Sequence, residues 1–433
     1  MKKLFGTLVR PRLEYSLLDH RPSAPQSMPT SKTLTLLYDR PFDSSGVADT
    51  ALLHRGDTIR TGEKLILFEG DPTPLISPVT GTITTLSPFT GDFGRQYTAI
   101  RVDAAKEDVF DNQFEAASKD PTLATALTYL TQVPGRPPLE LFTDPEKPID
   151  TIVVYGLDSD LFSTTHQYAL TANPTAVRDG IGILKKITGV ENVTIVVPRH
   201  FVHGFGDMGA DMKAVDTHYP STHPFLIARN VLGRTVSAGK TCEDLGIAFF
   251  SAEAMASLGQ AFTTGKIPHI KTLTLATKEG VSRLVSVRIG SPVADILTET
   301  GITLNEQDRI IFGGPMTGSA IYSLDQPIQP DTDVIFLQDR DDIPQSADTP
   351  CINCGECVQV CPVLIPVNML VRFLGVGQYE EAADQYDLHA CIECGFCSYV
   401  CVSKIPISQY IRLAKYELAR MQETEMETEE TDA

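Results

Sequence analysis

Apolar residues along the chain form short runs whose spacing changes from one region to the next. Between residues 36 and 105, brief apolar segments alternate with glycine turns, as in "LLHRGDTIRTGEKLILFEG" and "SPVTGTITTLSP". Two apolar runs joined by a tight glycine turn are typical of paired β-strands. This region therefore predicts a small barrel or sandwich of β-structure.

The pattern between residues 117 and 265 predicts a parallel sheet. "IDTIVVYGL" (149–157) and "VENVTIVVP" (190–198) are apolar runs of strand length, and "TAVRDGIGILKKITG" (175–189) has helical apolar spacing with a glycine stop. A strand, a helix and a second strand in this order form a βαβ unit, whose strands pair in parallel. We therefore expect an α/β, nucleotide-binding-like domain.

Residues 270–340 return to strand patterns with one helix among them. "HIKTLTLAT" and "RLVSVRIG" precede the helical segment "SPVADILTETG", and "DRIIFGGPMTG" and "TDVIFLQ" follow it. This order favours a β-grasp-like α+β module. Residues 349–418 then combine most of the cysteines with two helices, so the whole chain is predicted to be a multidomain α/β and α+β protein.

The composition excludes some classes of binding partner and indicates the cellular compartment. The 433 residues exceed what one core can hold, and the net charge of −19 argues against nucleic acid or anionic lipid as a main partner. The N-terminal segment lacks the apolar core of a signal peptide, and no window is apolar enough for a transmembrane helix. The acidic run 423–433 is predicted to be disordered. We expect a cytoplasmic protein of a prokaryote-like cell, because the cysteine pattern requires reducing conditions.

Eight of the nine cysteines lie in two similar runs, "CINCGECVQVCP" (351–362) and "CIECGFCSYVCV" (391–402). Both have the C-x2-C-x2-C-x3-C spacing of bacterial ferredoxins with two [4Fe–4S] clusters, in which the fourth cysteine of each run ligates the other cluster. We therefore predict that cluster 1 is held by Cys351, Cys354, Cys357 and Cys401, and cluster 2 by Cys391, Cys394, Cys397 and Cys361.

A pair of zinc sites is the main alternative. Zinc sites with four cysteines usually take two ligands from each of two turns, whereas a triplet plus a single cysteine, in duplicate, is not that pattern. Val402 stands where the first run has Pro362, which removes no ligand. The ninth cysteine, Cys242, has no partner pattern and is predicted to be a buried thiol.

With these motifs, the order of modules resembles the C subunit of Rnf electron-transport complexes (RnfC). The resemblance rests on "RGDTIRTGEKL", "SPVTGTI", "VSVRIGSPVADILTETG", "IFGGPMTG" and the double cysteine run. It covers about residue 40 to residue 418. It implies a lead-in (1–35), a barrel-sandwich hybrid (36–105), an RnfC-like α/β core (117–265), a soluble-ligand-binding (SLBB) β-grasp module (270–340), a ferredoxin-like domain (349–418) and an acidic tail (419–433).

The resemblance also implies a role. Members are peripheral, cytoplasmic subunits, held at the inner face of the cell membrane by partner subunits. They take electrons from NADH through bound FMN, or pass them between a soluble carrier and a membrane complex. We therefore expect a component of an oxidoreductase complex whose partners are other subunits and, among carriers, ferredoxin, flavodoxin or NADH.

The flavin loop of the family is not matched. FMN-binding members carry a "GGAGFPT"-type loop and an "NGAECEP"-type strand end, where this chain has "QVPGRPPLELF" (132–142) and "VVYGLDSDLF" (153–162). Glycines let backbone N–H groups approach a phosphate, and proline has no N–H. "HYPSTHPFL" (218–226) also lacks the family's Gly-Gly-Glu. In these places the chain resembles NqrA, the related subunit of sodium-pumping NADH:quinone reductases, and the change argues against FMN.

Three interpretations of function follow. The chain is an electron-transfer subunit without its own flavin, an NADH dehydrogenase subunit with FMN bound by a divergent loop, or a non-redox scaffold with structural clusters. Weak candidates for cofactor contact are Asp158 and Asp160, which follow a predicted parallel strand, and Gly313 and Gly314, which begin "GGPMTG". A solvated loop and a plain turn are the simpler interpretations.

Two further groups of side chains have alternative interpretations. Four histidines within a short span are expected to be polar loop residues rather than metal ligands: His200, His203, His218 and His223. Four basic residues beside the second cluster would form a face that steers an acidic carrier, unless they are ordinary solvated charges: Lys404, Arg412, Lys415 and Arg420.

Overall fold

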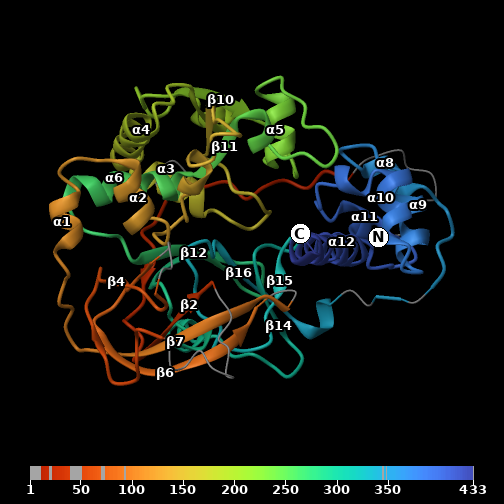
Figure 1. The fold of residues 1–433 in the computed structure, drawn as a ribbon. Helices are drawn as coiled ribbons and strands as arrows, with labels where there is room; N and C mark the ends of the chain where they lie inside the picture. The colour runs from red at the N-terminus through yellow and green to blue at the C-terminus, as the bar shows by residue number, and fades with distance from the viewer. Residues whose placement is uncertain are drawn as a thin grey trace.

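The computed structural model describes residues 11–18, 22–39, 51–69, 74–91, 94–343, 346–347 and 349–432. An α/β part lies beside a β-rich part, and the C-terminal helices pack to one side of both (Figure 1). None of the helices in these ranges is long and apolar enough to span a membrane. The fold is therefore a mixed α/β assembly with a helical C-terminal domain.

The first β-region forms an antiparallel sheet in the order β2-β7-β6-β3, with a separate pair of strands beside it. Burial alternates along β2, so that Leu34, Leu36 and Tyr38 enter the core. The strands are antiparallel as predicted, but they do not pair across the Gly-Asp turn or across Gly81, because β3 pairs with β6 and β4 with β5. The barrel-sandwich assignment stays a prediction. The strands are β2 (Thr33–Tyr38), β3 (Thr58–Ile59), β4 (Lys64–Leu65), β5 (Leu75–Ile76), β6 (Gly81–Thr90) and β7 (Gln96–Ala104).

The α/β part contains a four-stranded sheet, β10-β9-β8-β11, in which every pairing is parallel. The predicted βαβ unit is confirmed, because β8 (Thr151–Tyr155) and β9 (Val193–Pro198) pair in parallel and the connection between them contains α3 (Thr165–Ala172) and the predicted helix α4 (Pro174–Thr188). The remaining elements are α1 (Gln113–Ala117), α2 (Leu123–Tyr129), β10 (Asp211–Val215), α5 (Pro224–Asn230), β11 (Ile247–Ser251) and α6 (Ala252–Thr264).

The next sheet has the order β1-β13-β12-β16-β14-β15. A parallel pair, β12 and β16, lies at its centre, with the antiparallel neighbours β13 and β14 on either side. This arrangement is compatible with the predicted β-grasp order; the SLBB label stays a prediction. The elements are β1 (Gln26–Ser27), β12 (Ile270–Ala276), β13 (Ser282–Arg288), α7 (Val293–Glu299), β14 (Arg309–Phe312), β15 (Ser319–Ala320) and β16 (Val334–Gln338).

The two ends of the chain differ from the sequence-based expectation. Part of the predicted lead-in is structured: β1 joins the third sheet, β2 begins at Thr33, and Tyr15 enters a core. The backbone of the predicted disordered tail continues α12 as far as Asp432. Glu, the commonest residue of this segment, has a favourable helix propensity.

The C-terminal domain consists of short helices around its own core. Helices α8 and α11 lie within the two cysteine runs and contact each other, so the internal repeat of the sequence is also a repeat of structure. Helix α10 lies in the segment between the two runs. The helices are α8 (Glu356–Val360), α9 (Val367–Leu374), α10 (Tyr379–Tyr386), α11 (Phe396–Val400) and α12 (Ile407–Asp432).

Candidate metal centres

The cysteines of the C-terminal domain line two cavities, four to each. Three cysteines in each cavity come from one run, and the fourth comes from the end of the other run. All eight are free thiols. This is the crossed grouping that the spacing predicts, with Cys351, Cys354, Cys357 and Cys401 around one cavity and Cys361, Cys391, Cys394 and Cys397 around the other.

The same local turn builds each cysteine triplet. Gly355 and Gly395 adopt the left-handed conformation, with φ of 79° and 73°, directly before α8 and α11. The turn also directs a backbone N–H to a sulfur: that of Glu393 donates to Cys391 Sγ at 3.4 Å. Backbone donors to thiolates are typical of iron–sulfur sites, where they stabilise the charge on sulfur.

The chemistry of the cysteines fits a positively charged metal core. Burial, followed by the charges of neighbouring thiolates, raises the pKa of Cys357 to about 11. Burial likewise raises the pKa of Cys394 to about 12. Such thiols are deprotonated when a metal supplies compensating positive charge.

The two cavities differ in how much of the chain covers them. Cys394 and Ile392 pack into a core shared with the parallel sheet, and Tyr219 Oη donates a hydrogen bond of 2.8 Å to Cys394 O. In the first run, Cys354 is exposed, and Ile352 is 58% exposed against 6% for Ile392. The second cavity therefore lies against the α/β part, whereas the first lies near solvent.

Asp160 contacts the turn formed by "GGPMTG" (313–318). Asp160 Oδ2 accepts hydrogen bonds from Thr317 N at 2.9 Å and Thr317 Oγ1 at 2.6 Å. Gly314 has no room for a Cβ, which would collide with the Asp160 carboxyl group. Burial raises the pKa of Asp160. Gly313 has a φ of 93° at the start of the same turn. The Asp160 carboxyl group is thus bound by the turn 313–318 through Thr317.

Asp158 has a different environment. Its carboxylate accepts hydrogen bonds from Ser163 Oγ at 2.6 Å and from the backbone N–H of His166 at 2.9 Å. It thus satisfies N–H groups at the start of α3. Contact of Asp158, Asp160 or the glycines with a cofactor stays a prediction.

Two basic residues of α12 hold the second cysteine loop, which the sequence did not predict. Lys415 Nζ donates to Cys391 O at 2.7 Å and pairs with Glu393 Oε1 at 2.8 Å. Arg412 Nη2 donates to Thr317 O at 2.7 Å. Their side chains are only 24% and 19% exposed. The expected basic docking face is therefore wrong for Arg412 and Lys415, because both are committed to internal partners.

The histidines have separate environments. His218 Nδ1 lies 2.6 Å from Asp216 Oδ1, and His223 Nδ1 accepts from the backbone N–H of Phe225 at 3.2 Å. Within the described ranges, none of these histidines belongs to a group of three His, Cys, Asp or Glu side chains that could hold a metal ion. The ninth cysteine, Cys242, is buried as predicted.

The loop that replaces the family's flavin loop uses its own donors. The N–H of Gly135 donates to Pro330 O at 2.8 Å, and that of Arg136 donates to Val133 O at 2.9 Å. The Arg136 side chain pairs with Asp331 at 2.8 Å. These backbone donors are thus already paired within the protein rather than directed at a phosphate.

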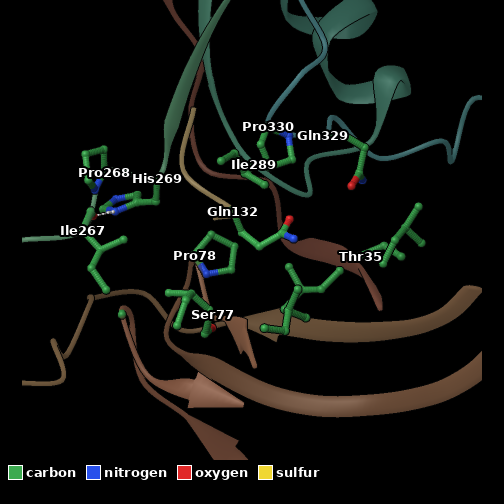
Figure 2. A pocket seen from close by; sticks show the side chains of 15 residues that line it. Thr35, Ser77, Pro78, Gln132, Ile267, Pro268, His269, Ile289, Gln329 and Pro330 are labelled. Atoms are coloured by element: carbon green, nitrogen blue, oxygen red, sulfur yellow. Dashed lines mark hydrogen bonds between the residues drawn. The ribbon is translucent and has the colours of Figure 1, made fainter. Parts of the chain in front are cut away.

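A groove of about 950 Å³ lies beside the loop that replaces the family's flavin loop, and its lining includes Arg136, Pro137, Glu140, Tyr38 and Tyr97. Two further hollows lie elsewhere. Figure 2 shows a pocket of about 30 Å³ at the seam of the β-region, Gln132 and the third sheet, where His269 Nδ1 lies 3.3 Å from Ile267 O. It holds little more than a water molecule. A groove of about 700 Å³ lies beside Cys391 and is lined by aromatic residues that include Tyr219, Phe225 and Phe249. Its volume lies in the range of small-molecule sites.

Residues 343–404 match the 4Fe-4S dicluster domain family. The crossed cysteine cavities and this match define an iron–sulfur electron-transfer protein with a dicluster domain.

Over a longer stretch, the chain is RnfC-like. It is 24% identical over 350 residues to the C subunit of the Na⁺-translocating ferredoxin:NAD⁺ oxidoreductase complex of Acetobacterium woodii, covering 75% of this chain and 78% of that protein. It is 30% identical over 303 residues to the C subunit of the ion-translocating oxidoreductase complex of Pseudomonas aeruginosa, covering 67% of this chain and 39% of that protein.

Among solved structures, the NAD⁺-reducing [NiFe]-hydrogenase in the H₂-reduced state aligns with 69% of this chain and 61% of its own. The TM-score is 0.41 and the identity 9%, which is too weak a similarity to indicate function.

Proposed function

We propose that this chain is an RnfC-like iron–sulfur subunit that relays electrons between a soluble carrier or NADH-linked partner and a membrane-associated redox complex. The observation that carries the proposal is the crossed grouping of the cysteines in two cavities. A [4Fe–4S] cluster bound in each cavity would supply one-electron storage at low potential. The proposed ligands are Cys351, Cys354, Cys357 and Cys401 for cluster 1, and Cys391, Cys394, Cys397 and Cys361 for cluster 2.

The surroundings of the two cysteine sites suggest which cluster exchanges electrons with which partner. The buried loop of cluster 2 lies against the α/β part, where Tyr219 contacts Phe396 with ring centroids 5.4 Å apart. The loop of cluster 1 carries the exposed Cys354 and Ile352. We infer that cluster 1 exchanges electrons with a partner protein, and that cluster 2 exchanges them with whatever binds the α/β part.

The partners are inferred from the relatives and from charge. The net charge of −19 disfavours adsorption to anionic lipid, because like charges repel over a Debye length of about 10 Å. Docking to other subunits at the inner face of the cell membrane is therefore the proposed route to the membrane. Ferredoxin, flavodoxin and NADH are the proposed sources or acceptors of electrons.

Anaerobic purification tests the proposal. About eight irons per chain and reduction of both centres by reduced ferredoxin would support it. About four irons, or clusters that no low-potential reductant can reduce, would contradict it.

A second candidate is an NADH dehydrogenase subunit with FMN bound by the divergent loop. The observation that favours it is a groove of about 950 Å³ lined by Arg136, Pro137 and Glu140 of that loop, with Tyr38 and Tyr97 on its wall. The test is anaerobic reconstitution with excess FMN followed by gel filtration. Stoichiometric flavin that co-elutes with the protein would support it, whereas complete loss of flavin would leave the subunit without its own flavin as the better description.

A further inference from the structure

The internal repeat allows the surroundings of the two cluster sites to be compared position by position. Residues forty apart are equivalent, so that Cys351 matches Cys391 and Asn353 matches Glu393. At the first site, Asn353 accepts a hydrogen bond of 3.0 Å from Asn368 Nδ2, and both side chains are neutral. At the second site the equivalent residue is an acid, and Gly375 is replaced by Lys415.

Cations at the second site are fixed by short contacts. Lys415 Nζ bonds to the carbonyl oxygen of a proposed cluster ligand, Cys391, at 2.7 Å, and to Glu393 Oε1 at 2.8 Å. Arg412 Nε lies 3.6 Å from Glu393 Oε2. Of the charged groups that contact the loop directly, two are cations and one is an anion, and the next carboxyl group, that of Asp160, is separated from the loop by Thr317. The network also reaches Asp160, because Arg412 binds Thr317 O and Thr317 binds the Asp160 carboxylate.

The two cations act against the effect of burial. Reduction adds one negative charge to a cluster that already carries four thiolates, and a buried site solvates that charge poorly. The loop of cluster 2 is the more buried of the two, so burial alone would make cluster 2 the harder one to reduce. A cation fixed at the loop stabilises the added electron, and low solvent exposure strengthens this interaction.

We propose that Lys415, positioned by Glu393 and assisted by Arg412, raises the reduction potential of cluster 2 and so keeps it within reach of cluster 1. This proposal rests on the proposed function, since it requires that both clusters are bound. In this proposal, Lys415 acts on cluster 2 through its fixed positive charge and does not contact an external carrier. At cluster 1, Arg372 stands in the place of Arg412 but is exposed, and Asn353 and Gly375 stand in the places of Glu393 and Lys415. Among the described residues, that loop therefore lacks the pair of a partly buried lysine and an acid.

The test is a redox titration of the reconstituted full-length protein, followed by electron paramagnetic resonance, with iron content measured on each sample. In Lys415→Met, the midpoint potential of cluster 2 should fall by at least about 59 mV, a tenfold change in its ratio of reduced to oxidised forms, while that of cluster 1 stays in place. Glu393→Gln should move cluster 2 in the opposite direction, because it removes the negative charge and keeps an acceptor for Lys415.

Matched variants separate charge from packing. Lys415→Arg should retain the wild-type potential. Arg420→Met, which removes a cation 62% exposed further along the same helix, should leave both potentials unchanged. Full iron content with an unshifted cluster 2 in Lys415→Met, or equal shifts in Lys415→Met and Arg420→Met, would overturn the inference. Loss of both clusters from the wild-type protein would instead overturn the proposed function.

Discussion

At the scale of single residues, the fourth cysteine of each run has a role that its neighbours do not. Cys361 ends α8 and Cys401 ends α11, and each lines the cavity formed by the other run's triplet. Each of these two cysteines therefore belongs to one run in the sequence and lines the site of the other run in the structure.

This crossing predicts the outcome of single substitutions. Cys361→Ser should mainly damage the cluster held by Cys391, Cys394 and Cys397, and Cys401→Ser the cluster held by the first triplet. Each variant should lose about half of the iron, with the two surviving resonance signals different from each other. Identical surviving signals in the two variants would contradict the crossed assignment.

His166 is a second residue whose environment matters. It is buried, and its Nε2 lies 3.2 Å from Asp333 Oδ2. Burial opposes the charged form, but Asp333 outweighs it and raises the pKa of His166 to about 9. Asp333 also pairs with the fully buried Lys271 at 2.6 Å, so this network joins the α/β part to the third sheet.

The raised pKa of His166 predicts a pH dependence. A group whose pKa is higher in the folded state stabilises the fold below its unfolded pKa, and the contribution is lost as pH rises through the folded pKa. Stability should therefore fall between pH of about 6.5 and 9, by ~1–3 kcal/mol. The check is urea unfolding at several pH values for wild type and His166→Gln. Equal slopes against pH in the two proteins would exclude His166 as the cause.

At the scale of elements, helices α4 and α6 pack through facing glycines. A Cβ on Gly180 would collide with the carbonyl oxygen of Met255, and one on Gly259 with that of Ala176. The absence of side chains at these positions lets the two backbones approach closely. The helix pair covers the parallel sheet that positions Tyr219 against the second cysteine loop.

The close approach predicts that Gly180→Ala destabilises the protein by ~1–3 kcal/mol, because the helices must separate. Gly182 lies in the same helix, but a Cβ there meets nothing within 4 Å. Gly182→Ala is therefore the matched control and should be neutral or stabilising by up to ~1 kcal/mol, since alanine favours helix. Thermal unfolding of both variants decides the matter, and equal effects would refute the packing argument.

At the scale of the whole molecule, the C-terminal domain has one end covered by the rest of the chain and the equivalent end open. Ile392 is 6% exposed and Ile352 is 58% exposed, although they occupy the same position in the repeat. Two hydrogen bonds hold the covered end. Tyr219 of the α/β part donates to Cys394 O, and Arg412 of α12 donates to Thr317 O in the "GGPMTG" turn.

The open end predicts where an electron-transfer partner docks. Ile352→Asp should slow reduction of the protein by reduced ferredoxin several-fold without changing iron content, because a charge at the contact disfavours docking. Val376, also apolar and 70% exposed, provides the control variant Val376→Asp. Stopped-flow rates that are equal for the two variants would place the docking site elsewhere.

Much of this protein was determined by the sequence alone. The cysteine spacing predicted the crossed cavities and the βαβ pattern predicted the parallel sheet, because each pattern is contained in one motif or one unit. The short apolar runs predicted antiparallel strands but not their partners, which come from elsewhere in the chain. At the chain ends, β1 of the lead-in pairs with β13, and the backbone of the tail that was predicted to be disordered continues α12.

Only the tertiary structure decided what surrounds each centre. Arg412 and Lys415 have the spacing of solvated helix charges, yet they are bound to Thr317, Cys391 and Glu393. Asp160 has the position of a ligand-binding residue, yet it binds Thr317, more than a hundred residues away. The physical reason is that burial and charge pairing depend on which distant surfaces meet, and the spacing of residues within one element contains no information about the surface that will cover it.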